Sequence, residues 1–145
     1  MAFIHVSGPA KTEGFKKTAS VAIAAGSALG FEQGYVRQAL NSTVRIAGIS
    51  VRKITSSSDD YADNSVIPVI VPSEDDVFEA DVVTGSATQA SVGVQYDLGS
   101  NTDGTAQGIT VSGTTYKVVT VVGFISATVV LVKFNANYAF ANKAN

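Results

Sequence analysis

The chain has 145 residues, of which 46% are hydrophobic and 15% are charged, and its net charge is −2. These values argue against a disordered chain and fit one domain with a hydrophobic core. The absence of cysteine excludes disulfides and thiolate metal sites. Proteins that bind nucleic acid usually carry a basic excess, so we expect no nucleic-acid partner. The low charged fraction predicts a largely neutral surface, which suits a protein that its neighbours partly cover.

The first 18 residues predict an extended N-terminal arm. They show little hydrophobic periodicity, and their aromatic residues Phe3 and Phe15 are isolated. We expect the β domain to run from residue 19 to residue 134. Its first apolar stretch, residues 19–25, is too short for periodicity to distinguish a helix from a strand.

The next part of the chain predicts two adjacent strands and then a third. Residues 29–31 and 35–37 flank a turn that contains glycine, which indicates a hairpin. Residues 44–52 alternate apolar and polar side chains, as a half-buried strand does. Residues 55–64 are polar and predict a loop, because their short side chains hydrogen-bond to their own backbone.

Three further strands are expected before the last third of the chain. Residues 66–71 form the first, and Pro68 places it at a sheet edge or delays its start, because proline donates no backbone hydrogen bond. Residues 77–83 alternate apolar and polar side chains, and residues 92–98 have strand-like composition. A loop rich in Gly, Ser, Asn, Thr and Asp follows, over residues 98–108.

Residues 108–134 give the strongest β signal, because more than half of them are Val, Ile or Thr. Ser112-Gly113 is a plausible two-residue turn of a first hairpin. A second hairpin is expected from residues 116–122 and 128–134, joined by a turn at residues 123–127.

The strands of this second hairpin are apolar on both faces. Val118 and Val122 lie on one face, and Val119 and Val121 lie on the other. Such a strand must be covered twice, by the core and by a second sheet or another subunit. Many short strands at this spacing predict an all-β fold, a single-domain β-barrel or β-sandwich with extended terminal arms.

No catalytic residue is expected, and the chain is not expected to be an enzyme. His5 is the only histidine, and no nucleophile lies beside it in the predicted arm. No glycine-rich phosphate loop follows a strand and opens a helix. A glycosidase with two distant carboxylates stays compatible with the sequence, but a chain without tryptophan offers few platforms for sugar stacking.

Three acidic segments could in principle hold a hard cation through oxygen ligands. They are Asp59, Asp60 and Asp63, then residues 74–76, then the loop at residues 97–104. The last segment lacks the glutamate that closes a calcium loop, and clusters as short as the first two are typical of solvated loops. We therefore expect no metal and no cofactor.

Charge is distributed unevenly along the chain. Up to Lys53 it holds seven basic and two acidic residues, whereas Asp59 to Asp81 holds eight acids and no base. Solvated loops explain this pattern, and so do two surfaces of opposite sign that set the register of subunits in an assembly. The most hydrophobic stretch, between Lys117 and Lys133, is shorter than the ~20 residues that span a bilayer, so no membrane association is expected.

Residues 135–145 predict a C-terminal arm or a closing edge strand. Tyr138 and Phe140 alternate there with small or polar residues. In one interpretation these rings pack on their own domain, and in the other they anchor an arm on the sheet edge of a neighbouring subunit. The residues expected at an interface with partners are Phe3, Phe15, Val119, Val121, Tyr138 and Phe140.

A family resemblance is carried by three segments: Ala24-Ala25-Gly26-Ser27-Ala28-Leu29, Gly34-Tyr35-Val36-Arg37-Gln38-Ala39 and Ala47-Gly48-Ile49-Ser50-Val51. In this order they resemble the opening of the small capsid decoration (cement) proteins of tailed phages. Later strands, such as Val92–Leu98 and Val130–Phe134, also resemble phage structural proteins. The motifs are turns and strands rather than catalytic signatures.

The resemblance implies a β-barrel or β-sandwich on the outer surface of a virion, bound to the major capsid protein. It also implies self-association, most often as a homotrimer, and synthesis in the host cytoplasm. Two alternatives remain open. The chain is another self-assembling virion subunit, such as a tail-tube, head-fibre or shell protein, or it is an extracellular carbohydrate-binding module.

Overall fold

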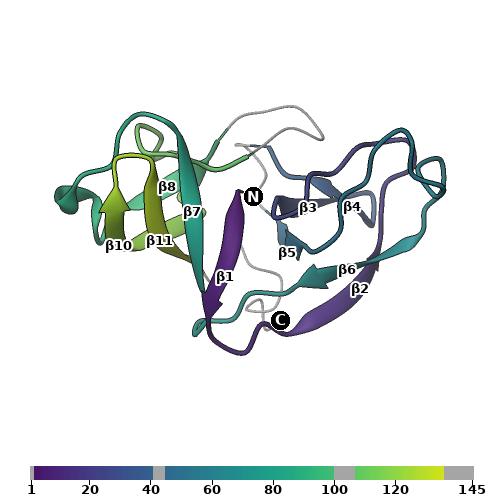
Figure 1. Ribbon diagram of the computed structural model, residues 1–145, viewed down its shortest axis with the longest axis horizontal. Helices are drawn as coiled ribbons and strands as arrows, with labels where there is room; N and C mark the ends of the chain where they lie inside the picture. The colour runs from purple at the N-terminus through teal and green to yellow at the C-terminus, as the bar shows by residue number, and fades with distance from the viewer. Residues whose placement is uncertain (1, 41–44, 100–106, 136–145) are drawn as a thin grey trace.

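The computed structural model describes residues 2–40, 45–99 and 107–135, and it confirms the all-β prediction. Figure 1 shows two sheets side by side, with β1 and β7 to β11 in the first and β2 to β6 in the second. The strands are β1 (Phe3–Ser7), β2 (Thr12–Lys16), β3 (Ala28–Glu32), β4 (Tyr35–Gln38), β5 (Ile46–Ser50), β6 (Val66–Ile70), β7 (Val77–Thr84), β8 (Gln95–Leu98), β9 (Ile109–Thr110), β10 (Val119–Ser126) and β11 (Val129–Phe134). One turn of 3₁₀ helix, η1 (Gln89–Ser91), precedes β8.

The first sheet closes into a five-stranded barrel. Its order is β1-β7-β11-β10-β8-β9, and β9 also pairs in parallel with β7. The two edges of β7 are used differently. One edge pairs with β11, whereas the other pairs with β1 over its first half and with β9 over its second half. The barrel is therefore formed by β7, β11, β10, β8 and β9, and β1 extends it.

The second sheet curls until its two edge strands meet. Its order is β2-β6-β5-β3-β4, and an isolated bridge between Lys17 and Val36 joins the end of β2 to β4. All five residues of β5 are buried. Ile46 and Ile49 pack in the core cluster of the first sheet, whereas Ala47 packs in the cluster inside the second sheet. The strand that is covered twice is thus β5.

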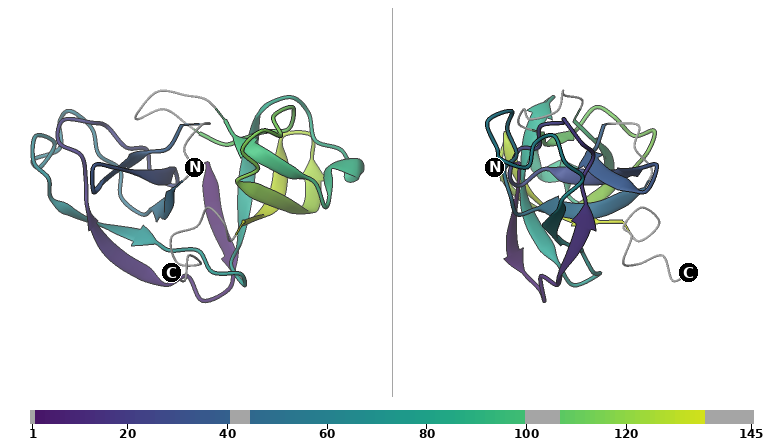
Figure 2. Two further views of the ribbon diagram at one scale, coloured as in Figure 1. Left: turned by 180° about the vertical axis from the view of Figure 1, so that it is seen from behind. Right: turned by 90° about the vertical axis from the view of Figure 1, so that its right-hand side faces the viewer.

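Two chain crossovers join the sheets, one between β1 and β2 and one between β6 and β7. They run together along one side of the molecule (Figure 2). The buried side chain of Gln107 adds a third link, since it accepts a hydrogen bond from the Ala28 N–H at 2.8 Å and donates one to the Ala39 carbonyl. One core cluster then draws residues from both sheets.

The predicted N-terminal arm is a pair of strands in this structure. Residues 3–7 form β1, which pairs with β7, and residues 12–16 form β2, which pairs with β6. The partners lie 50 or more residues further along the chain, so no local pattern indicates the pairing. The strands are extended, as predicted, but they belong to the two sheets.

Local turn signals were reliable where the partner strand is adjacent. The hairpin of β3 and β4 is confirmed, and both residues of its turn have positive φ, 52° for Gln33 and 86° for Gly34. β6 lies inside the second sheet and begins at Val66, so Pro68 neither marks an edge strand nor delays the start of the strand. The pairing of β6 with β5 starts at Val69, one residue beyond the proline, so no hydrogen bond of that ladder is lost.

The two predicted C-terminal hairpins differ in detail. Gly123 lies inside β10, which continues through two bulges, and the turn to β11 falls at residues 127–128. Residues 114–116 form no strand. The carboxylate of Asp97 accepts the backbone N–H groups of residues 115, 116 and 117 instead, at 2.6–3.2 Å. The Asp97 side chain thus accepts hydrogen bonds from N–H groups that a partner strand would bind in the predicted hairpin.

Candidate functional site

Three of the predicted interface residues belong to the core of the subunit. Phe3 is 1% exposed and its ring centroid lies 5.2 Å from that of Phe134. Val119 and Val121 are completely buried. These side chains face the interior of the barrel, so in this structure they do not offer a surface to a partner.

The other three predicted interface residues have different positions. Phe15 is half-buried, and it packs edge-to-face on Phe31 with ring centroids 5.4 Å apart. It therefore covers the interior of the second sheet. Tyr138 and Phe140 lie outside the described residues.

The acidic segment at residues 74–76 contributes one buried carboxylate. Asp76 accepts hydrogen bonds from the N–H of Ser73 at 2.8 Å, from the N–H of Ala10 at 2.9 Å, and from the hydroxyl of Ser73 at 3.0 Å. Nε2 of His5 lies 2.8 Å from the same carboxylate. Burial would raise the pKa of Asp76, but these hydrogen bonds outweigh burial and hold the pKa below its usual value.

This carboxylate fixes the two crossovers to each other. His5 lies in β1 and Ala10 in the first crossover, whereas Ser73 and Asp76 lie in the second. Gly8 has φ of 106°, and a Cβ there would lie 2.5 Å from a carboxylate oxygen of Asp76. The only histidine and this acid therefore have a structural role where the sheets join.

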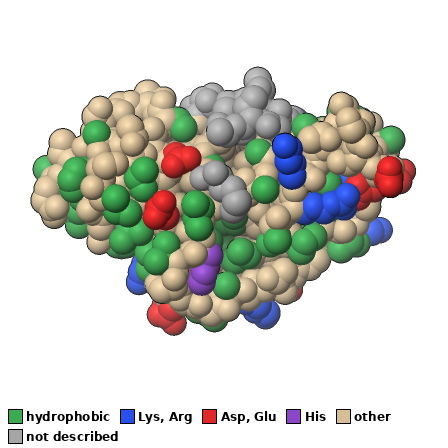
Figure 3. All heavy atoms as spheres, viewed as in Figure 1, with side chains coloured by type: hydrophobic (Ala, Val, Ile, Leu, Met, Phe, Trp, Pro, Cys, Tyr) green, Lys and Arg blue, Asp and Glu red, His purple; other side chains and the backbone are tan. Residues whose placement is uncertain are grey.

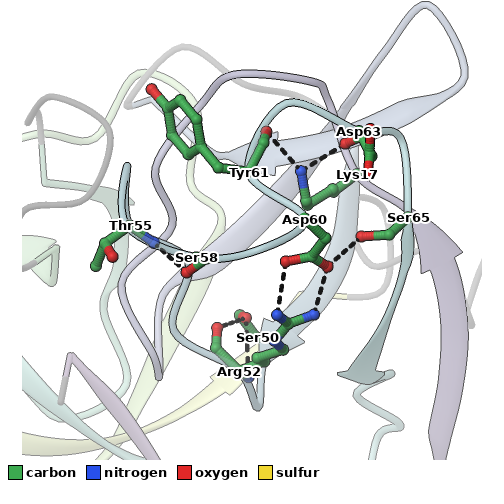
Figure 4. A network of polar contacts seen from close by, with 9 residues as sticks. All are labelled: Lys17, Ser50, Arg52, Thr55, Ser58, Asp60, Tyr61, Asp63 and Ser65. Atoms are coloured by element: carbon green, nitrogen blue, oxygen red, sulfur yellow. Dashed lines mark hydrogen bonds and ion pairs between the residues drawn. The ribbon is translucent and has the colours of Figure 1, made fainter.

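The loop at residues 55–64 is held by an ion pair. The guanidinium of Arg52 donates two hydrogen bonds of 2.7 Å to the carboxylate of Asp60, and the hydroxyl of Ser65 donates a third (Figure 4). The hydrogen bonds from Arg52, and next those from Ser65, hold the pKa of Asp60 well below its usual range. This acid is therefore engaged within the subunit.

The same loop surrounds a buried ammonium group. Lys17 is completely buried, and its Nζ donates hydrogen bonds to the backbone carbonyls of Tyr61 at 3.0 Å and Asp63 at 2.5 Å (Figure 4). The side chain of Asn64 returns a hydrogen bond to the Lys17 carbonyl at 2.9 Å. The loop oxygens thus bind a lysine of the chain itself. Within residues 2–40, 45–99 and 107–135, no three His, Asp or Glu side chains converge on one point.

One small pocket lies against the hairpin of β3 and β4. It has a volume of about 210 Å³ and is lined by Phe31, Glu32, Arg37 and their neighbours. Two of these lining residues form an ion pair, in which the guanidinium of Arg37 lies 3.1 Å from the carboxylate of Glu32. Drug-sized ligands usually occupy roughly 300–1,000 Å³, so this pocket is too small to suggest a site for one.

The outward face of β1, β7, β11 and β10 is unusually apolar. Ile4, Glu79, Leu131 and Gly123 are opposite one another across the four strands, so they share this face. Ile4 is 42% exposed and Val122, beside Gly123, is 40% exposed. Figure 3 shows hydrophobic side chains gathered over these strands. We call this surface, with the carboxylates of Glu79 and Asp81, the acidic half-face.

A second apolar strip follows β6 on the same side of the molecule (Figure 3). Val66 is 59% exposed, and Pro68 is also exposed. The carbonyl of Pro68 accepts a hydrogen bond from Val51, which is 51% exposed. Lys16 is exposed opposite Val66 in the ladder of β2 and β6. We call this strip, with Lys16, the basic half-face.

Sequence patterns do not single out these exposed residues. They place Ile4 and Val66 in extended segments and Val122 in a doubly apolar strand. Which side of a strand faces water depends on its partners: in β10, Val119 and Val121 are buried, whereas Val122 lies on the outward side with Thr120. Only the excess of apolar over charged residues in the sequence indicates that apolar side chains remain at the surface.

In the described part of the chain, we find no helix with the length and hydropathy required to cross a bilayer. Comparison of the chain with models of protein families, with curated proteins and with solved structures found no significant match.

Proposed function

We propose that this chain is a structural subunit of a virus particle, a decoration protein that binds the outer surface of a capsid and stabilises the head. Its partners are the major capsid protein and other copies of itself. It works through surface contacts between folded proteins, without a catalytic step or a cofactor.

The observation that carries the proposal is the broad apolar face formed by the acidic and basic half-faces. Ile4, Val122 and Val66 are each at least 40% exposed and stand on strands of two closed sheets. Contiguous apolar surface of this kind marks contacts with other proteins more often than a small-molecule site, which is concave. The resemblance of the segments at residues 24–51 to phage decoration proteins supports the same proposal.

The test uses shells assembled from the major capsid protein encoded beside the gene for this chain. Adding the purified chain should raise the temperature at which the shell melts or releases its DNA, and the rise should saturate. A ligand that binds only the assembled shell stabilises it by mass action. An equal mass of an inert protein controls for crowding.

Two results would count against the proposal. One is an unchanged melting temperature at a concentration where the chain is bound. The other is a gene neighbourhood that encodes no capsid protein. Specific binding of glycans by the monomer would instead favour the carbohydrate-binding module.

A further inference from the structure

We propose that the acidic half-face of one copy docks on the basic half-face of a second copy, in a dimer with two-fold symmetry. This inference deepens the proposed function, because it names a second copy of the chain as the occupant of the exposed face. It also replaces the trimer implied by the family resemblance with a dimer as the unit that forms in solution.

The placement of the two half-faces makes the surface self-complementary. Both lie on the side of the molecule drawn in Figure 3, one over β1, β7, β11 and β10 and the other along β6. A rotation of 180° about an axis between them, parallel to the face, brings each half-face of one copy onto the other half-face of its partner. Both contacts form at once, as in an isologous interface, and the assembly closes at two copies.

The charges on the two half-faces have opposite sign. Glu79 and Asp81 lie on the acidic half-face, where Lys133 is the only base on the outward side of the described strands. Lys16 is exposed on the basic half-face, and Lys53 is exposed two residues beyond Val51. In a two-fold pair each acidic group faces the basic side of the partner. Opposite charges around an apolar centre fix the register of an interface and disfavour the alternative in which like half-faces meet.

The apolar residues supply the centre of each contact. Val122 and Ile4 on one side meet Val66 and Val51 on the other, and all four are at least 40% exposed in the single chain. Burying them removes apolar side chains from water at two equivalent places. Both half-faces stand on paired strands, so little chain ordering is needed on binding.

The first measurement is the mass of the full chain by light scattering coupled to gel filtration. We expect about twice the chain mass of 14.9 kDa at tens of micromolar. Lys16→Glu and Glu79→Lys each place like charges opposite each other in the dimer. Each should weaken the dimer about tenfold or more while the circular dichroism spectrum and the melting temperature of the monomer stay unchanged.

Mixing the two variants provides the decisive test. A Lys16→Glu chain paired with a Glu79→Lys chain has opposite charges at both contacts, so the heterodimer should form with near wild-type affinity. Glu32→Lys makes the same two-unit change in charge at the exposed end of β3, a strand of neither half-face, and it should leave the dimer intact. Val66→Glu removes part of the apolar centre and should abolish the dimer.

The proposal is overturned if the wild-type chain is a monomer or a trimer, or if its dimer is insensitive to the changes at Lys16, Glu79 and Val66. It is also overturned if the mixed variants do not associate. Shell stabilisation is scored separately with the same proteins. A wild-type monomer that still raises the melting temperature of shells would reject the dimer and leave the proposed function standing.

Discussion

The side chain of Gln107 makes hydrogen bonds to the backbone of the second sheet that a neighbouring strand would otherwise make. It is completely buried, and its amide satisfies one N–H and one carbonyl of the second sheet. Asp97 and Asp76 act similarly, because each carboxylate gathers backbone N–H groups from a loop. These polar residues hold together segments that lie far apart in the sequence.

Replacing Gln107 with alanine should destabilise the protein by about 1–3 kcal/mol for each buried group left without a partner. The affected groups are the N–H of Ala28 and the carbonyl of Ala39. Urea unfolding followed by circular dichroism measures the loss. Gln95→Ala, at an exposed position of β8, is the matched control and should change stability little. Equal stability of the two variants would show that Gln107 does not join the sheets.

Asp76 should make the stability of the protein depend on pH. Its pKa in the folded protein lies below the value of about 3.9 expected in the unfolded chain. Its contribution is therefore complete above the unfolded pKa and is lost as pH falls through the folded pKa.

Asp76→Asn should accordingly be less stable than the wild type at pH 7, and the difference should narrow below about pH 4. Thermal melts across pH 2–8 measure both curves. Asp75→Asn, at an exposed neighbour, should follow the wild type. A difference that is independent of pH would mean that the charge of Asp76 is irrelevant.

At the scale of single elements, two glycines have different constraints. Gly34 has φ of 86° in the turn between β3 and β4, with open space where a Cβ would lie. Gly48 in β5 has φ of 153°, and a Cβ there would lie 2.1 Å from the carbonyl oxygen of Ile70 in β6. The first position needs only a permissive backbone, whereas the second also needs the absence of a side chain.

Gly34→Ala should therefore cost about 1–2 kcal/mol, the usual price of a left-handed conformation. Gly48→Ala should cost clearly more, because the strands β5 and β6 must also move apart. The two variants are compared by urea unfolding under the same conditions. If Gly48→Ala is as stable as Gly34→Ala, then the backbones of β5 and β6 do not approach each other as closely as this structure indicates.

The elements with local signals were predicted best. The β3–β4 hairpin and β7 follow from turn residues and alternation. The pairing of β1 with β7 and of β2 with β6 does not, because the partner residues lie 50 or more positions away in the sequence. The bulges of β10 displace the turn from its predicted position. An isolated aromatic in a predicted arm (Phe3) and a doubly apolar strand (Val119 and Val121) both fit an interface, but neither pattern distinguishes a covered surface from the core in which these residues lie. The exposed half-faces required the register of the sheets.

At the scale of the whole molecule, the two sheets share one core cluster, and the second sheet contains another. Leu98 belongs to the shared cluster and Leu29 to the cluster of the second sheet. Both are completely buried. This arrangement favours a single unfolding unit, as the sequence analysis predicts for one domain.

Calorimetry should show one cooperative transition whose enthalpy matches the two-state value. Leu98→Ala and Leu29→Ala should each lower that same transition, by about 2–5 kcal/mol in unfolding free energy. Two separate transitions, with each variant shifting only one, would show that the sheets are independent domains.

The closure of the barrel by β9 has a consequence for solubility. Because β9 pairs with both β7 and β8, the five barrel strands form a ring, and β1 is left as the edge strand of this sheet. Open strand edges are the usual templates for amyloid-like growth, and ring closure confines the open edge of this sheet to the five residues of β1. The barrel strands can then display adhesive apolar side chains while offering a fibril little open backbone on which to nucleate.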